Sequence, residues 1–72
     1  MRDALGRFIR PLPARQEETL AVYARTGRIK TTAHELGIEY ETARHSLGRA
    51  YERLGVTNAI EAFRVLGWLR LP

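Results

Sequence analysis

Apolar residues recur at intervals of three and four along most of the chain, which is the period of amphipathic helices. Over residues 14–25, Leu20, Tyr23 and Ala24 share one helical face. Gly27 follows, and glycine ends helices readily because it adopts the left-handed backbone conformation. The pattern therefore predicts a first helix from residue 14 to about residue 25.

A second, shorter helix is predicted in the segment IKTTAHEL. Ile29, Ala33 and Leu36 recur at helical spacing, and Gly37 stands where the helix would end. We expect this helix to begin near residues 28–30, because a later start would leave only about one turn.

The third predicted helix is the longest and covers about residues 40–54. Its apolar positions are Ala43, Leu47, Ala50 and Leu54. Gly48 interrupts this helix at a cost of up to ~1 kcal/mol relative to alanine. That cost indicates either crowding or a need for close approach on the side of Gly48. Gly55 ends the helix.

A fourth helix is predicted after Asn58, whose side chain suits the cap position. Ala59, Ala62, Phe63 and Leu66 line it, and Gly67 ends it. Trp68 and Leu69 then either complete the core or cover an interface. The chain contains no strand-period segment, so we predict an all-α fold with four helices.

Chain length limits the fold to one domain, since 72 residues bury only about 60% of the surface that the unfolded chain exposes. We expect residues 1–11 to form a short N-terminal arm and residues 12–72 to form the helical domain. The arm could follow phosphates, add a dimer contact or fray as an ordinary terminus.

The chain is moderately basic. The net charge is +4 and the pI is about 10.3, with eleven arginines and one lysine. This balance favours polyanionic partners, although such charges also serve solubility alone. The apolar runs are far shorter than the roughly 20 residues that span a bilayer, and the first ten residues lack the apolar run of a signal peptide. We therefore expect a soluble cytoplasmic protein without a membrane partner.

Candidate chemistry is sparse. There is no cysteine, Asp3 is the single aspartate, and His34 and His45 lie on different predicted helices. No glycine-rich phosphate loop is present. We therefore expect neither an enzyme nor a metal or cofactor site. The lack of disulfides in so small a chain makes association with a second copy attractive.

The segment HELGIEYE joins the second and third predicted helices through a tight, glycine-containing turn. A short helix, such a turn and a longer helix form the pattern that places its second helix in a major groove. Similar corners also occur in proteins that do not bind DNA.

Beyond this corner, the chain resembles the LuxR/GerE-type helix-turn-helix DNA-binding domain from Leu12 to Leu69. The matching residues are Leu12, Arg15, Glu18, Leu20, Lys30, Ala33, Leu36, Gly37, Ile38, Thr42, Arg44, Leu54, Gly55, Val56, Asn58, Glu61 and Ala62. The chain departs from the family pattern at Glu39, Ala43 and Ser46, where serine, valine and histidine are usual. The resemblance implies a standalone DNA-binding transcription regulator.

If the resemblance holds, one face of the third helix enters the major groove. The residues on this face, which the resemblance implies contact bases, are Glu41, Arg44, His45 and Gly48. Arg44 is the best candidate for a bidentate guanine contact, worth about 1 to 3 kcal/mol of discrimination. The alternative is an arginine that is merely solvated, as most surface arginines are.

A second set of residues is placed to bind phosphates and fix the register on DNA. These residues are Lys30, Thr31, Thr42, Arg49 and Arg53. Arg49 and Arg53 could instead pair with Glu52 or other neighbours along the helix.

The resemblance also implies that the fourth helix mediates dimerisation. The residues concerned are Ala59, Ala62, Phe63, Leu66 and Trp68. The alternative is that they complete the monomer core, and we expect a mixture of both roles. A symmetric dimer would read two half-sites about 34 Å apart.

The sequence thus predicts a sequence-specific, duplex DNA-binding transcription regulator that acts as a homodimer. The alternative is a protein-interaction module that binds RNA polymerase or another regulator. Glu39 and Glu41 favour the alternative, whereas Lys30, Arg44 and Arg49 favour DNA. We expect no receiver or ligand-binding domain upstream, which suits a standalone regulator, a phage-type regulator or an inhibitory partner equally well.

Overall fold

The computed structural model describes residues 11–68, and this part of the chain is all-helical, without strands. Its helices are α1 (Ala14–Thr26), α2 (Ile29–Leu36), α3 (Tyr40–Leu54) and α4 (Ala59–Leu66). The four predicted helices are confirmed, with ends that agree to within about a residue. Of the predicted N-terminal arm, residues 1–10 lie outside the described part, as does Leu69.

Each helix ends at a glycine in the left-handed conformation. The φ angles are 70° at Gly27, 67° at Gly37, 72° at Gly55 and 77° at Gly67. Residues with a Cβ atom rarely adopt this conformation, so these positions stop the helices where the sequence pattern predicts. Among the helix starts that the structure describes, α4 has a side-chain cap, in which the Asn58 carboxamide oxygen accepts a hydrogen bond from the Glu61 backbone amide at 3.0 Å.

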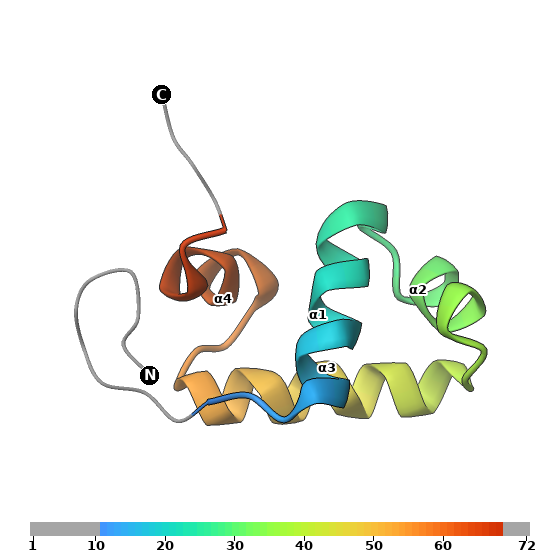
Figure 1. Ribbon diagram of the computed structural model, residues 1–72, viewed down its shortest axis with the longest axis horizontal. Helices are drawn as coiled ribbons and strands as arrows, with labels where there is room; N and C mark the ends of the chain where they lie inside the picture. The colour runs from blue at the N-terminus through green and yellow to red at the C-terminus, as the bar shows by residue number, and fades with distance from the viewer. Residues whose placement is uncertain (1–10, 69–72) are drawn as a thin grey trace.

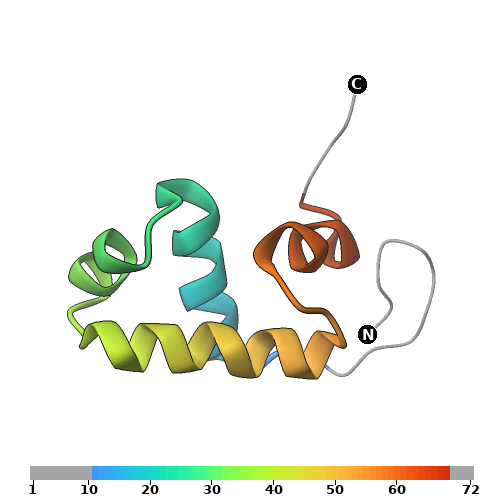
Figure 2. The same ribbon diagram turned by 180° about the vertical axis from the view of Figure 1, so that it is seen from behind.

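The long helix α3 forms the base of the molecule, and the other helices pack on one side of it (Figure 1, Figure 2). α1 crosses the middle of α3, α2 lies towards its N-terminal end and α4 towards its C-terminal end. α2 and α4 therefore do not contact each other. This arrangement leaves the outer side of α3 uncovered by the other three helices.

The core lies between α3 and the helices above it. The apolar residues buried there are Leu12, Leu20, Leu47, Ala50, Leu54, Ala62 and Val65. Ala33 of α2 is also buried. The burial of Ala43 completes the apolar stripe predicted for α3, which is thereby confirmed. In α1 the predicted face is partly wrong, since Leu20 is buried and Tyr23 is partly buried but Ala24 is exposed.

The inward face of α1 is rotated because the polar residue Thr19 belongs to it. Thr19 is fully buried, and its hydroxyl group donates a hydrogen bond to the Arg15 carbonyl oxygen at 2.8 Å. Ser46 of α3 donates in turn to the Thr19 hydroxyl oxygen at 3.3 Å. Turning Thr19 inward moves Ala24 to the solvent side of the helix.

Nothing in residues 11–68 forms a helix with the length and apolar character needed to cross a membrane.

Candidate nucleic-acid interface

The amphipathic period of α3 separates a buried side from an exposed side. Ala43 and Leu47 face the core, with 0% and 2% of their surface exposed. Glu41, Arg44 and His45 lie on the outer side, and their side chains are 62%, 51% and 66% exposed. The structure therefore brings together three of the residues predicted to contact bases and presents them on a helix surface that the other described helices leave uncovered.

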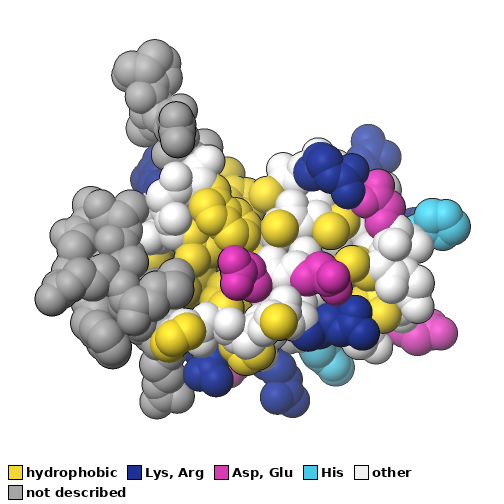
Figure 3. All heavy atoms as spheres, in the orientation of Figure 1, with side chains coloured by type: hydrophobic (Ala, Val, Ile, Leu, Met, Phe, Trp, Pro, Cys, Tyr) yellow, Lys and Arg dark blue, Asp and Glu magenta, His cyan; other side chains and the backbone are white. Residues whose placement is uncertain are grey.

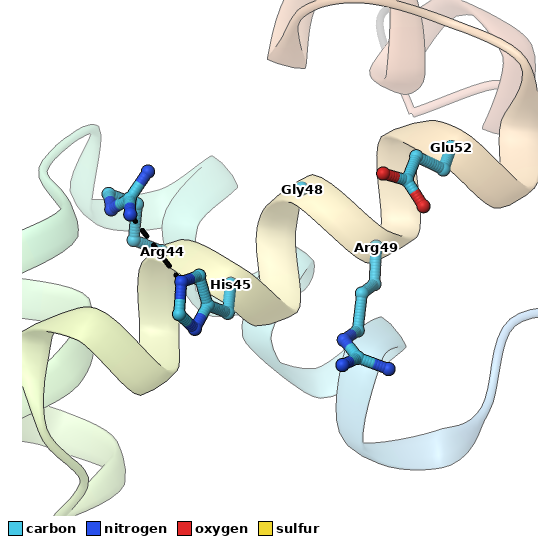
Figure 4. Close-up of a pocket in the computed structure, with 5 residues that line it drawn as sticks. All are labelled: Arg44, His45, Gly48, Arg49 and Glu52. Atoms are coloured by element: carbon cyan, nitrogen blue, oxygen red, sulfur yellow. Dashed lines mark hydrogen bonds between the residues drawn. The ribbon is translucent and has the colours of Figure 1, made fainter.

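Gly48 continues this surface one turn further along α3. It helps to line an open hollow that runs along the helix (Figure 4). The lining residues are Arg44, His45, Gly48, Arg49 and Glu52. A Cβ atom built at Gly48 would meet no atom within 4 Å. Crowding within the monomer therefore does not explain this glycine, and the space in front of it is open to another molecule.

Arg44 and Glu41 form a forked ion pair on this surface. The Arg44 Nε lies 3.2 Å from both carboxylate oxygens of Glu41, and the Arg44 Nη2 lies 2.9 Å from Glu41 Oε2. The hydrogen bond from Arg44 holds the pKa of the Glu41 carboxyl below its usual value, and the same bond raises the pKa of Arg44. Both groups are therefore charged at neutral pH.

His45 lies beside this pair. Its Nε2 atom is 3.4 Å from the Arg44 Nη2 (Figure 4). The same atom is 3.8 Å from the Glu41 Oε2. The three side chains thus form one exposed polar cluster at the first turns of α3. Imidazole can donate to or accept from a base or a phosphate, so this cluster offers donors and acceptors together.

The exposed side of α3 also meets the beginning of α1. A second hollow is lined by Pro13, Arg15, Gln16, Thr42, His45, Ser46 and Arg49. Thr42 and Arg49, predicted to contact phosphates, therefore lie together with the base-contact candidate His45. The sequence reasoning missed Arg15 and Gln16 as neighbours of this surface, because they are far from α3 in the chain and belong to a different helix.

The remaining phosphate candidates do not line this hollow. Lys30 and Thr31 are exposed in the first turn of α2. The residue before that helix, Arg28, makes no side-chain cap, so the amides of the first turn remain available to an anion. Arg53 is only partly exposed and lies beside Gln16, Arg49 and Glu52.

The predicted dimer residues divide between core and surface. Ala62 is fully buried and offers no area to a partner, whereas Ala59, Phe63 and Leu66 are partly buried. Trp68 is 39% exposed and stacks on Phe63 with ring centroids 6.1 Å apart.

Ile60 is 52% exposed and was missed, since the sequence pattern did not place it on the apolar face of α4. Figure 3 shows hydrophobic side chains gathered between α4 and α1, whereas charged side chains crowd the end near α2. The exposed apolar surface of α4 therefore lies away from the polar cluster on α3.

Within residues 11–68 no group of three or more His, Cys, Asp or Glu side chains is placed to hold a metal ion. The arrangement on α3 is suited to hydrogen bonding and to charge pairing with another polar surface.

Comparison with known proteins finds no family model, no curated protein and no solved structure that matches the chain.

Proposed function

We propose that this chain is a sequence-specific, duplex DNA-binding transcription regulator of the LuxR/GerE type, which inserts α3 into the major groove and acts as a homodimer. One observation carries the proposal: the outer side of α3 presents Arg44, His45 and Gly48 on a surface that none of the other described helices covers. A major groove about 12 Å wide admits one α-helix with its side chains.

The charges around this surface support DNA as the partner. Arg49 lies one turn after His45 in α3 and lines the same hollow as Thr42. The DNA backbone would pass at this place beside the inserted helix. Lys30 and the uncapped start of α2 supply a second contact of the same kind. The resemblance of the sequence to the LuxR/GerE pattern supports the same assignment of α3.

The proposal is tested by selection from a random duplex DNA library with the purified full chain at near-physiological salt. We expect an enriched motif with two-fold symmetry and half-sites about one helical turn apart. A bound pool with no enriched sequence would contradict the proposed function.

Arg44→Ala is the sharpest single substitution in this proposal. We expect affinity for the selected site to fall by about 5- to 150-fold, which corresponds to the loss of one bidentate guanine contact. Helical content should not change, because Arg44 is exposed and alanine favours helices. Electrophoretic mobility shift and circular dichroism measure the two quantities.

Arg64→Ala is the matched control, since it removes the same charge from an exposed position on α4. Equal losses in the two variants would show that only net charge matters and would remove Arg44 from the reading surface.

A protein-interaction module is the second candidate function, and one observation favours it. Tyr40 is 48% exposed at the start of α3, beside the exposed carboxylates of Glu39 and Glu41. An aromatic ring among acidic groups suits a basic protein surface better than a phosphate backbone. Measuring the affinity at several salt concentrations separates the two candidates. The logarithm of DNA affinity falls linearly with the logarithm of the salt concentration, with a slope of about 0.9 per neutralised phosphate.

A further inference from the structure

We propose that Glu41 contacts no base and instead positions the Arg44 guanidinium for reading a guanine edge, so that Glu41 determines specificity through Arg44. This inference rests on the proposed function, since it assigns roles within the same DNA-reading surface. It differs from the sequence-based expectation, in which Glu41 is one of the four residues of the third helix that contact bases.

Arg44 already occupies the Glu41 carboxylate. Both of its oxygens are already used by Arg44, at 3.2 Å from Nε and, for Oε2, 2.9 Å from Nη2. A carboxylate that accepts from a cytosine amino group would have to give up at least part of this fork. The positive charge of Arg44 also compensates the negative charge of Glu41. An isolated carboxylate at this place would be repelled by the phosphates.

Arg44 retains hydrogen-bond donors that the fork with Glu41 does not use. A guanidinium group carries five N–H donors in a fixed plane. The carboxylate takes the side edge, formed by Nε and one hydrogen of Nη2. The end edge, formed by Nη1 and the other hydrogen of Nη2, remains for a ligand. Nη1 has no hydrogen-bond partner among residues 11–68. Apart from Glu41, Nη2 has one further neighbour there, the His45 Nε2 at the long distance of 3.4 Å.

The free end edge matches the acceptors of guanine. Two parallel N–H donors meet O6 and N7 in the major groove, which is the commonest specific arginine contact. Because the fork fixes both the position and the plane of the guanidinium, Arg44 loses less rotamer freedom when it binds. An unrestrained arginine in the same place can equally reach a neighbouring base or a phosphate.

Removing the carboxylate should therefore have two opposite effects. Affinity for DNA of any sequence should rise, because one negative charge leaves the binding surface. Discrimination at the base pair read by Arg44 should fall, because the guanidinium is no longer fixed. Removing a negative charge that does not touch Arg44 should produce the first effect without the second.

The chain offers a matched control for this comparison. Glu39 lies two residues before Glu41 and is likewise exposed, and as the residue preceding α3 it makes no side-chain capping bond. Glu39→Gln and Glu41→Gln remove the same charge from the same end of α3. Glutamine at position 41 cannot form the fork, since its amide nitrogen is a donor facing the donors of Arg44.

The experiment measures dissociation constants of the full chain and three variants. The variants are Glu41→Gln, Glu39→Gln and Arg44→Ala. The probes are the selected duplex and duplexes with each base pair of a half-site changed in turn. Arg44→Ala identifies the base pair that Arg44 reads. We expect the wild type to discriminate there by about 5- to 150-fold and Glu41→Gln to lower that ratio by about 1.4- to 5-fold, the effect of losing one exposed ion pair. Glu39→Gln should keep the ratio.

Each outcome decides between the roles. If Glu41→Gln keeps the ratio, or if Glu39→Gln loses it equally, Glu41 does not position Arg44 and the inference fails while the proposed function stands. If Glu41→Gln loses discrimination at a base pair that Arg44→Ala does not affect, Glu41 contacts that base pair directly and the inference fails. A wild-type chain that prefers no sequence would contradict the proposed function and this inference together.

Discussion

The Thr32 hydroxyl group fixes the corner between α1 and α2 from inside the molecule. Thr32 is fully buried, and its hydroxyl donates to the Arg28 carbonyl oxygen at 2.8 Å. The Thr26 hydroxyl oxygen, at the end of α1, lies 2.8 Å from the Thr32 hydroxyl oxygen. One buried side chain therefore links the last residue of α1 to the first turn of α2.

Replacing Thr32 by valine should destabilise the fold by about 1 kcal/mol, since the shape is kept but these hydrogen bonds are lost. Unfolding by urea, followed by circular dichroism, measures this difference. Thr31→Val is the control, because Thr31 is exposed on the same helix and the change of residue type is identical. A loss of the same size in both variants would show that the hydroxyl of Thr32 is not the cause.

At the scale of a helix, the consequence of Gly48 for α3 is a conflict between stability and binding. A Cβ atom at this position meets nothing within 4 Å in the monomer. Gly48→Ala should therefore stabilise the fold by about 0.5 to 1 kcal/mol through helix propensity. If α3 lies deep in a groove, the larger Gly48→Leu should in contrast weaken DNA binding at least tenfold.

Thermal unfolding and mobility shift measure these opposite effects. Ala21→Leu, at an exposed position of α1, controls for the addition of an apolar side chain elsewhere. Undiminished DNA affinity in Gly48→Leu would mean that the outer side of α3 at Gly48 does not approach the ligand.

Much of each helix could be predicted from sequence, because glycine and apolar spacing act locally. The helix ends at Gly37 and Gly55 could be predicted because glycine readily adopts a positive φ angle. The buried stripe of α3 could be predicted from the spacing of its apolar residues. The burial of Thr19 and Thr32 could not be predicted, since it depends on carbonyl groups and hydroxyls that only the folded chain brings within reach.

The candidate site was predictable to a similar extent. The helical period places Arg44 and His45 on one side of α3, and the structure agrees. Whether Arg44 is solvated or paired with Glu41 depends on the side-chain rotamers. A spacing of three residues permits this pairing but does not ensure it. The neighbouring residues Arg15 and Gln16 depend on how α1 crosses α3, which has no local signal.

At the scale of the whole molecule, the proposed dimer depends on apolar surface that one copy leaves exposed. Ile60 and Trp68 are 52% and 39% exposed, on or just after α4. In a symmetric pair the same patch would meet itself, so one substitution changes both halves of the interface.

Ile60→Glu should therefore shift the chain towards monomer and weaken binding to a two-half-site duplex more than to a single half-site. Helical content should stay the same because Ile60 is not part of the core. Sedimentation equilibrium and mobility shift with both duplexes measure these changes. Val65→Ala, which alters a buried residue of the same helix, separates lost stability from lost association. An unchanged mass distribution would place the dimer contact elsewhere.

The separation of α2 and α4 along α3 has a consequence for how such a protein can vary. Arg44 and Leu54 lie ten residues apart on one helix, which corresponds to about 15 Å. Effects of substitutions at that distance usually add without coupling. If α3 reads the target and α4 makes the dimer contact, as proposed, substitutions at the two places can therefore accumulate independently, so that the protein could acquire a new target while keeping its dimer partner.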